Sequence, residues 1–94
     1  MEIHLVHEIL CNESINCLVQ FEMYIVAGLR SSIILMWDIV DYTHKHTIDL
    51  SEGPHKNNRQ SINYIATDFD SKSLWVAFLN IIVELKQKVK ERNF

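Results

Sequence analysis

The sequence is poor in the residues that usually make turns, because its 94 residues include only two glycines and one proline. An all-β domain joins many short strands through tight turns, and such turns draw heavily on glycine and proline. Apolar residues make up 48% of the chain and charged residues 22%, which is typical of a globular protein. The shortage of turn residues therefore favours a helical domain.

Cysteine is equally scarce, and no long apolar run is present. Cys11 and Cys17 are the only two cysteines, and their spacing matches no common zinc-binding pattern. Gly28 and Arg30 interrupt the longest nearly uncharged stretch, residues 23–37, which is too short to span a bilayer. No signal peptide is recognisable at the start. We expect a cytoplasmic protein with reduced thiols, no membrane contact, no metal and no cofactor.

Charge is divided unevenly along the chain. Residues 1–50 carry two basic and seven acidic side chains, whereas residues 51–94 carry seven basic and five acidic ones. The acidic half is poorly suited to nucleic acid. The basic side chains near the end could contact RNA phosphates, although a solvated helix face would have the same composition. These residues are Lys86, Lys88, Lys90 and Arg92.

Apolar residues recur at helical spacing along most of the chain. Leu74, Phe78, Ile81 and Leu85 are part of the clearest such stripe. A capping pattern at residues 57–60 and the Gly53–Pro54 loop before it punctuate the second half. The expected helices cover residues 2–11, 12–28, 31–46, 57–69 and a final segment around 74–89.

Gly28 stands between two of these expected helices and determines the predicted architecture. Glycine tolerates the left-handed backbone that follows a helix end, and Ser31 or Ser32 could cap the next helix. The predicted fold class is therefore all-α. It is a small bundle of four to five helices in a single domain over residues 1–94, with a central helical hairpin that corners at Gly28.

A competing interpretation is all-β. The stretch from Ile15 to Asp38, which ends in Trp37–Asp38, looks like a blade of a WD-type propeller, and residues 61–85 resemble a weaker second copy. Against this interpretation, no aspartate occupies the turn before Trp37, and Leu85 stands where a second tryptophan would fall. Two blades also cannot close a ring.

The expected hairpin resembles that of prokaryotic HEPN-type proteins, a helical family of RNA-cleaving toxins, their inactive relatives and abortive-infection factors. Tyr24, Ala27–Gly28, Arg30–Ile33 and Trp37 carry the resemblance, which covers about residues 14–45. It implies a helical, cytoplasmic protein of a toxin–antitoxin or phage-defence system.

The resemblance also bears on catalysis. In that family a late helix carries an arginine, a polar residue and then a histidine, and Arg92 and Asn93 match the first two positions. Arginine would stabilise charge on the phosphate, and histidine would move a proton. The histidine is missing here, so Arg92 and Asn93 are the only catalytic candidates and an enzyme is not expected.

Aromatic residues exceed what so small a core needs, which suggests contact with a partner or a second copy. We assign partner binding to Arg30, Trp37, Trp75 and Phe78. The leading functional hypothesis is a non-catalytic HEPN-like protein-interaction module of a microbial or phage defence system. The alternatives are a phage-type inhibitor that binds a host nucleic-acid enzyme, a degenerate ribonuclease that borrows His44 or His46, and a WD-type propeller fragment.

Overall fold

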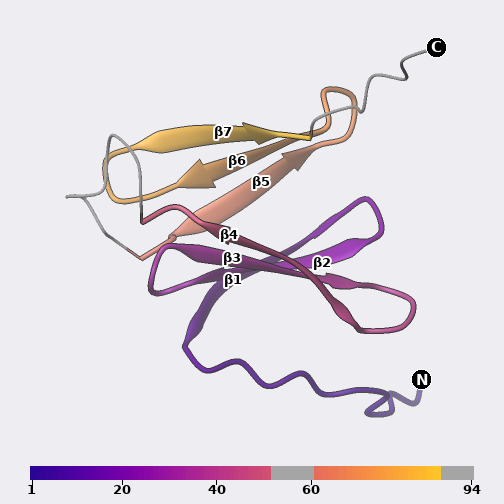
Figure 1. The fold of residues 1–94 in the computed structure, drawn as a ribbon. Helices are drawn as coiled ribbons and strands as arrows, with labels where there is room; N and C mark the ends of the chain where they lie inside the picture. The colour runs from indigo at the N-terminus through magenta and orange to yellow at the C-terminus, as the bar shows by residue number, and fades with distance from the viewer. Residues whose placement is uncertain (52–60, 88–94) are drawn as a thin grey trace.

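The computed structural model describes residues 1–51 and 61–87, and these residues form an all-β fold (Figure 1). Seven strands make two antiparallel sheets, one of four strands and one of three. The first sheet contains β1 (Ile15–Phe21), β2 (Tyr24–Leu29), β3 (Ile33–Asp38) and β4 (His44–Asp49). The second contains β5 (Tyr64–Asp68), β6 (Ser73–Ala77) and β7 (Ile82–Lys86).

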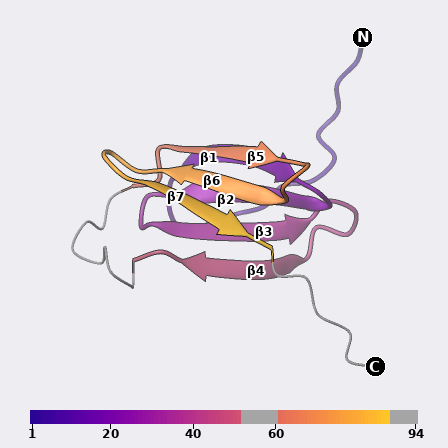
Figure 2. The ribbon, with the colours of Figure 1, turned by 90° about the horizontal axis from the view of Figure 1, so that it is seen from above.

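Each sheet is a simple meander in which every strand pairs with its neighbours in sequence. The chain leaves the first sheet at its edge strand β4 and begins the second at β5, which lies beside β1. The two sheets are stacked, with β5–β7 over β1–β3 and with β4 beyond them (Figure 2). The first strands of the two sheets therefore lie close together.

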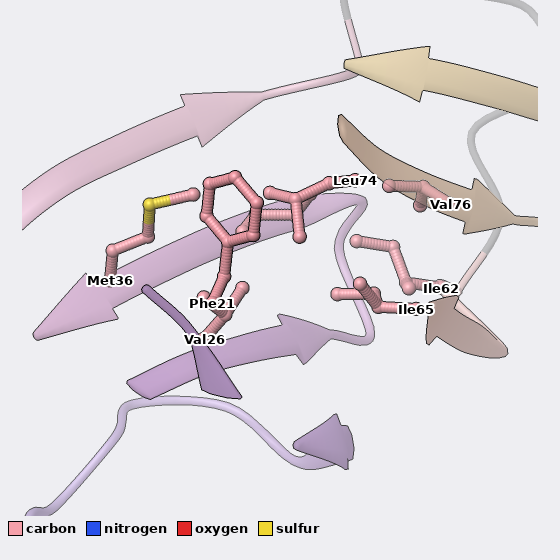
Figure 3. Close-up of a cluster of buried hydrophobic side chains, with 8 residues drawn as sticks. Phe21, Val26, Met36, Ile62, Ile65, Leu74 and Val76 are labelled. Atoms are coloured by element: carbon pink, nitrogen blue, oxygen red, sulfur yellow. The ribbon is translucent and has the colours of Figure 1, made fainter. Parts of the chain in front are cut away.

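The main core lies between the sheets (Figure 3). Its buried members are apolar side chains from both sheets, together with Ile62 just before β5. On the first sheet they are Phe21, Val26, Ile34 and Met36, and on the second Ile65, Leu74 and Val76. Burial of this apolar surface is the main force that holds the two sheets together.

A second, smaller cluster lies on the opposite face of the first sheet. Ala27, Leu29 and Trp37 are buried there, and Ile9 and Cys11 of the segment before β1 pack against them. The first sheet thus buries apolar side chains on both faces. Strands of this kind are continuous apolar runs without strict alternation, and β3, with the sequence IILMWD, is an example.

This structure shows that the all-α prediction is wrong. No residue in the described part of the chain is helical, so neither the bundle of four to five helices nor the helical hairpin exists there. Gly28 is a buried residue within β2, where it pairs with Cys17 of β1 and Ile34 of β3. The expected loop around Gly53–Pro54 and the expected cap at 57–60 lie outside the described residues.

The turns use residues other than glycine. Four non-glycine residues have positive φ, and each lies in a turn between strands of one sheet: Glu22, Ser32, Tyr42 and Lys72. Aspartates stabilise two of these turns, because Asp38 Oδ1 accepts hydrogen bonds from the Val40 and Asp41 amides, and Asp68 carboxylate oxygens accept from Asp70 and Ser71. The shortage of glycine therefore did not exclude a β fold.

The HEPN resemblance does not survive either, because the residues that carried it belong to strands. Tyr24, Ala27 and Gly28 are in β2, Ile33 and Trp37 are in β3, and the intervening residues 30–32 form the turn between these strands. A helical HEPN-like domain is incompatible with this arrangement. The toxin–antitoxin and defence context rested on that resemblance and is withdrawn with it.

Candidate interaction surfaces

The outer face of the β5–β7 sheet, turned away from the main core, carries exposed apolar side chains. Tyr64 on β5, Trp75 on β6 and Ile82 on β7 expose 64%, 41% and 73% of their surface. Tyr64 pairs with Ala77, and Ala77 pairs with Ile82. One row across the sheet therefore contains Tyr64, Ala77 and Ile82. We call Tyr64, Ala66, Trp75, Ala77 and Ile82 the outer apolar face.

Polar residues border this face at its other end. Trp75 pairs with Glu84, and Ser73 pairs with Asp68 on one side and with Lys86 on the other. The Ser73 hydroxyl donates a hydrogen bond of 2.7 Å to Glu84 Oε2. An apolar centre with a hydrogen-bonded, charged border is typical of protein–protein interfaces.

The outer face of the first sheet is partly covered by the segment before β1, although Leu18 of β1 remains 63% exposed there. Ile9 and Cys11 pack on this face, and the ring of His7 stacks on Tyr42 with centroids 4.2 Å apart. A small cavity of about 240 Å³ remains beneath the segment, with Trp37 and Ile25 among its walls. This face of the sheet therefore already has an occupant.

A larger cavity of about 380 Å³ opens between the sheets where β4 and β7 diverge. Phe21, Met36, Ile48, Leu74 and Leu85 line its apolar walls. His46, Lys86 and Gln87 also line it, so its surface is partly polar. The main core is thus incompletely filled beside β7.

The four predicted partner-binding residues are not brought together. Trp75 lies on the outer apolar face, whereas Trp37 is buried in the smaller cluster of the first sheet. Phe78 is half-buried and packs against the main core, and Arg30 is exposed in the turn between β2 and β3. Of the four, only Trp75 combines an aromatic ring with a position on an open sheet face.

The residues proposed for RNA contact or cleavage form no site in the described part of the chain. Arg92, Asn93, Lys88 and Lys90 lie outside it, and Lys86 is an exposed residue of β7. His44 and His46 are exposed on β4, where their rings make edge contacts with Trp37 and Tyr24 respectively. Among residues 1–51 and 61–87, no group of three or more metal-ligating side chains is present.

Burial and turn hydrogen bonds explain the shifted pKa values of three titratable groups. Burial raises the pKa of the Cys17 thiol, so this cysteine is not an activated nucleophile. Hydrogen bonds from Thr43 lower the pKa of Asp41, and hydrogen bonds from Ser71 lower that of Asp68. Asp41 is exposed in the turn between β3 and β4, and Asp68 is half-buried at the end of β5, where it accepts hydrogen bonds from the following turn.

Comparison with known protein families, with curated proteins and with solved structures found no match. Among the described residues, no helix is long and apolar enough to cross a membrane. The outer apolar face therefore has to be interpreted from its own chemistry.

The sequence analysis missed Tyr64 and Ile82, which complete this face. A signal was available, since Tyr64 and Ala66, Trp75 and Ala77, and Ile82 and Glu84 are each two residues apart. A spacing of two places side chains on one face of a strand. The helical interpretation of the same apolar residues hid this alternation.

Proposed function

We propose that this chain is a non-catalytic protein-interaction module built from two successive blade-like sheets of the WD type. In this proposal the outer apolar face packs against the sheet of another blade. The observation that carries it is the exposure of Tyr64, Trp75 and Ile82 on one side of a sheet whose other side carries the buried core residues Ile65, Leu74 and Val76. Exposed apolar patches bordered by polar residues commonly mark protein interaction sites.

The connectivity supports the blade interpretation. A four-stranded meander is followed by a second meander stacked on it, and the chain passes from the edge strand β4 to β5 beside β1. Trp37 and Asp38 end the third strand of the first sheet. Two such sheets cannot close a ring, and this leaves the outer face of β5–β7 open for a further sheet.

A cytoplasmic location is part of the same proposal. Cys11 and Cys17 are free thiols in the structure, as expected of a protein from a reducing compartment. No covalent or redox chemistry is assigned to them.

Trp75→Glu tests the proposed surface, because it places a charge at the centre of the outer apolar face. We expect the unaltered protein to associate at micromolar concentration and the variant to associate at least tenfold more weakly. Light scattering after size-exclusion chromatography measures the mass. Tryptophan emission supplies a second readout, since Trp75 is exposed and Trp37 is already buried.

Val40→Glu is the matched control. Val40 is an exposed apolar residue in the turn between β3 and β4, away from the outer apolar face. This variant should associate like the unaltered protein. A chain that stays monomeric at all concentrations, or that loses association equally in both variants, would refute the proposed surface.

A further inference from the structure

We propose that residues 2–6 of one copy add as a fourth strand to the open edge of β7 in a second copy of this chain. The inference rests on the proposed function, because it names the partner of the module. It also gives the second sheet the same number of strands as the first. Three independent features of the structure lead to it.

The first feature is the edge itself. Within the described residues β7 pairs only with β6. Hydrogen bonds from Phe78 N to Ile81 O (2.9 Å) and from Gln87 N to Lys72 O (3.3 Å) fix which residues of β7 face β6. Ile81 and Gln87 bond to the residues that flank β6, and the side to which the backbone groups point alternates from one residue to the next along an antiparallel strand. The even-numbered residues of β7 therefore direct their N–H and C=O groups to the open side. These residues are Ile82, Glu84 and Lys86.

The second feature is an uncovered apolar segment of the right length. Ile3, Leu5 and Val6 expose 85%, 83% and 79% of their surface. Residues 2–6 belong to no strand and form no backbone hydrogen bond with any described residue. They are five residues, as is β7. An exposed apolar segment and an open strand edge are together the ordinary requirement for strand addition.

The third feature is the cavity between β4 and β7. Leu85 of β7 lines it, and an added strand would place its inward side chains beside Leu85 and Val83. Filling apolar space of this kind stabilises a core. The donated segment would therefore supply both backbone hydrogen bonds and apolar side chains.

One antiparallel register between residues 2–6 and β7 places the apolar side chains of both strands on matching faces. Ile3 and Leu5 then lie inward opposite Leu85 and Val83, while Val6 lies outward beside the exposed Ile82. Opposite charges also meet, since Glu2 faces Lys86, and such cross-strand pairs are favourable. The full set of pairs is Glu2 with Lys86, Ile3 with Leu85, His4 with Glu84, Leu5 with Val83 and Val6 with Ile82.

The donor and the acceptor belong to different copies. His7 and Ile9 hold the N-terminal segment against the first sheet, on the side away from the second sheet (Figure 1). Residues 2–6 start from there and cannot reach their own β7 without releasing these contacts. A second copy can present its β7 without any such change.

Disulfide cross-linking between singly substituted proteins tests the register directly. Leu5 and Val83 would form a pair without mutual hydrogen bonds, the arrangement that brings Cβ atoms closest in an antiparallel sheet. We expect a mixture of Leu5→Cys and Val83→Cys proteins to form a disulfide-linked heterodimer under mild oxidation. A mixture of Leu5→Cys and Val40→Cys contains the same native cysteines and should give at least tenfold less.

Blocking the edge provides the second measurement. Glu84→Pro removes an N–H that faces the open side, while Glu84→Val keeps the N–H and replaces the same side chain. Cross-linking should fall at least tenfold in the proline background and persist in the valine background. Equal cross-linking in both backgrounds, or in both mixtures, would overturn the proposed strand.

The outcomes separate the two proposals. Association that depends on Trp75 without cross-linking between Leu5→Cys and Val83→Cys would overturn the donated strand and leave the interaction surface intact. Cross-linking that persists in the Trp75→Glu background would support the strand and count against the outer apolar face. A strictly monomeric chain without cross-linking would refute both.

Discussion

Gly28 is buried within β2, between Cys17 of β1 and Ile34 of β3. Its backbone does not turn a corner. It lies where the two sheets come close, because an added Cβ atom would stand 2.6 Å from Cys17 Sγ and 2.7 Å from Ile62 Cγ2. Glycine is needed here for space and not for an unusual backbone conformation.

Gly28→Ala should therefore destabilise the protein. We expect the free energy of unfolding to fall by about 1–3 kcal/mol, because an extra methyl group is forced into a filled core. Urea unfolding followed by circular dichroism measures it. Adding Cys17→Ala to this variant should recover part of the loss by making room on β1, and an unchanged stability of Gly28→Ala would contradict the close contact.

Trp37 and Trp75 lie in very different surroundings, although the sequence treated them alike. Both are large aromatic residues in apolar stretches, and the sequence marked both for partner binding. The structure buries Trp37 under Ile9 and Cys11 and leaves Trp75 on an open face. Composition identified the aromatic residues, but only the pairing of strands determines which of them is exposed.

At the scale of elements, the turns explain why the fold class could not be predicted. Glu22, Ser32, Tyr42 and Lys72 adopt positive φ although only a few per cent of non-glycine residues do so. Aspartate and serine side chains supply hydrogen bonds within the turns. Counting glycine and proline therefore underestimated the number of turns.

The strands were misread for a second reason. β2 and β3 are buried on both faces, so their apolar residues are nearly continuous and give no clean period of two. Short runs of this type fit helix and strand equally well. β1, β6 and β7, each with one more exposed face, retain an alternation that sequence reasoning could have used.

The turn carboxylates predict how stability depends on pH. Asp41 and Asp68 have lowered pKa values because hydrogen bonds from Thr43 and Ser71 favour the charged form. Their contribution is complete above the ordinary aspartate pKa of about 3.9 and is lost as the pH falls below it.

Urea midpoints between pH 7 and pH 2.5 would measure this dependence. We expect little change from pH 7 to about pH 5, and a decline as the pH falls through about 4. Asp41→Asn combined with Asp68→Asn should be less stable at pH 7 and should decline less in acid. A double variant with the same pH profile as the unaltered protein would contradict the role of these turns.

At the scale of the whole molecule, the two sheets differ in how completely they are covered. The first has the second sheet on one face and the N-terminal segment on the other. The second sheet has one buried face, one open face and, in the described residues, an open edge at β7. The sequence indicated a surplus of apolar surface but could not assign it to one sheet.

Association should therefore appear as a dependence of thermal stability on protein concentration. A partner that binds only the folded state raises the unfolding temperature by mass action. We expect the unfolding midpoint to rise by a few degrees between about 1 and about 100 µM protein, and to rise less for Trp75→Glu. Differential scanning fluorimetry measures both proteins, and a midpoint independent of concentration in each would contradict the prediction.

The meander connectivity also has a consequence for how the chain folds. Every strand pair joins neighbours in sequence, whereas the contacts that unite the sheets, between β1 and β5 and across the main core, join residues far apart in the chain. Closing short loops costs little entropy, and proteins rich in local contacts fold quickly. Each hairpin can form before the sheets meet, so docking of two preformed sheets would be the slow step that limits the folding rate.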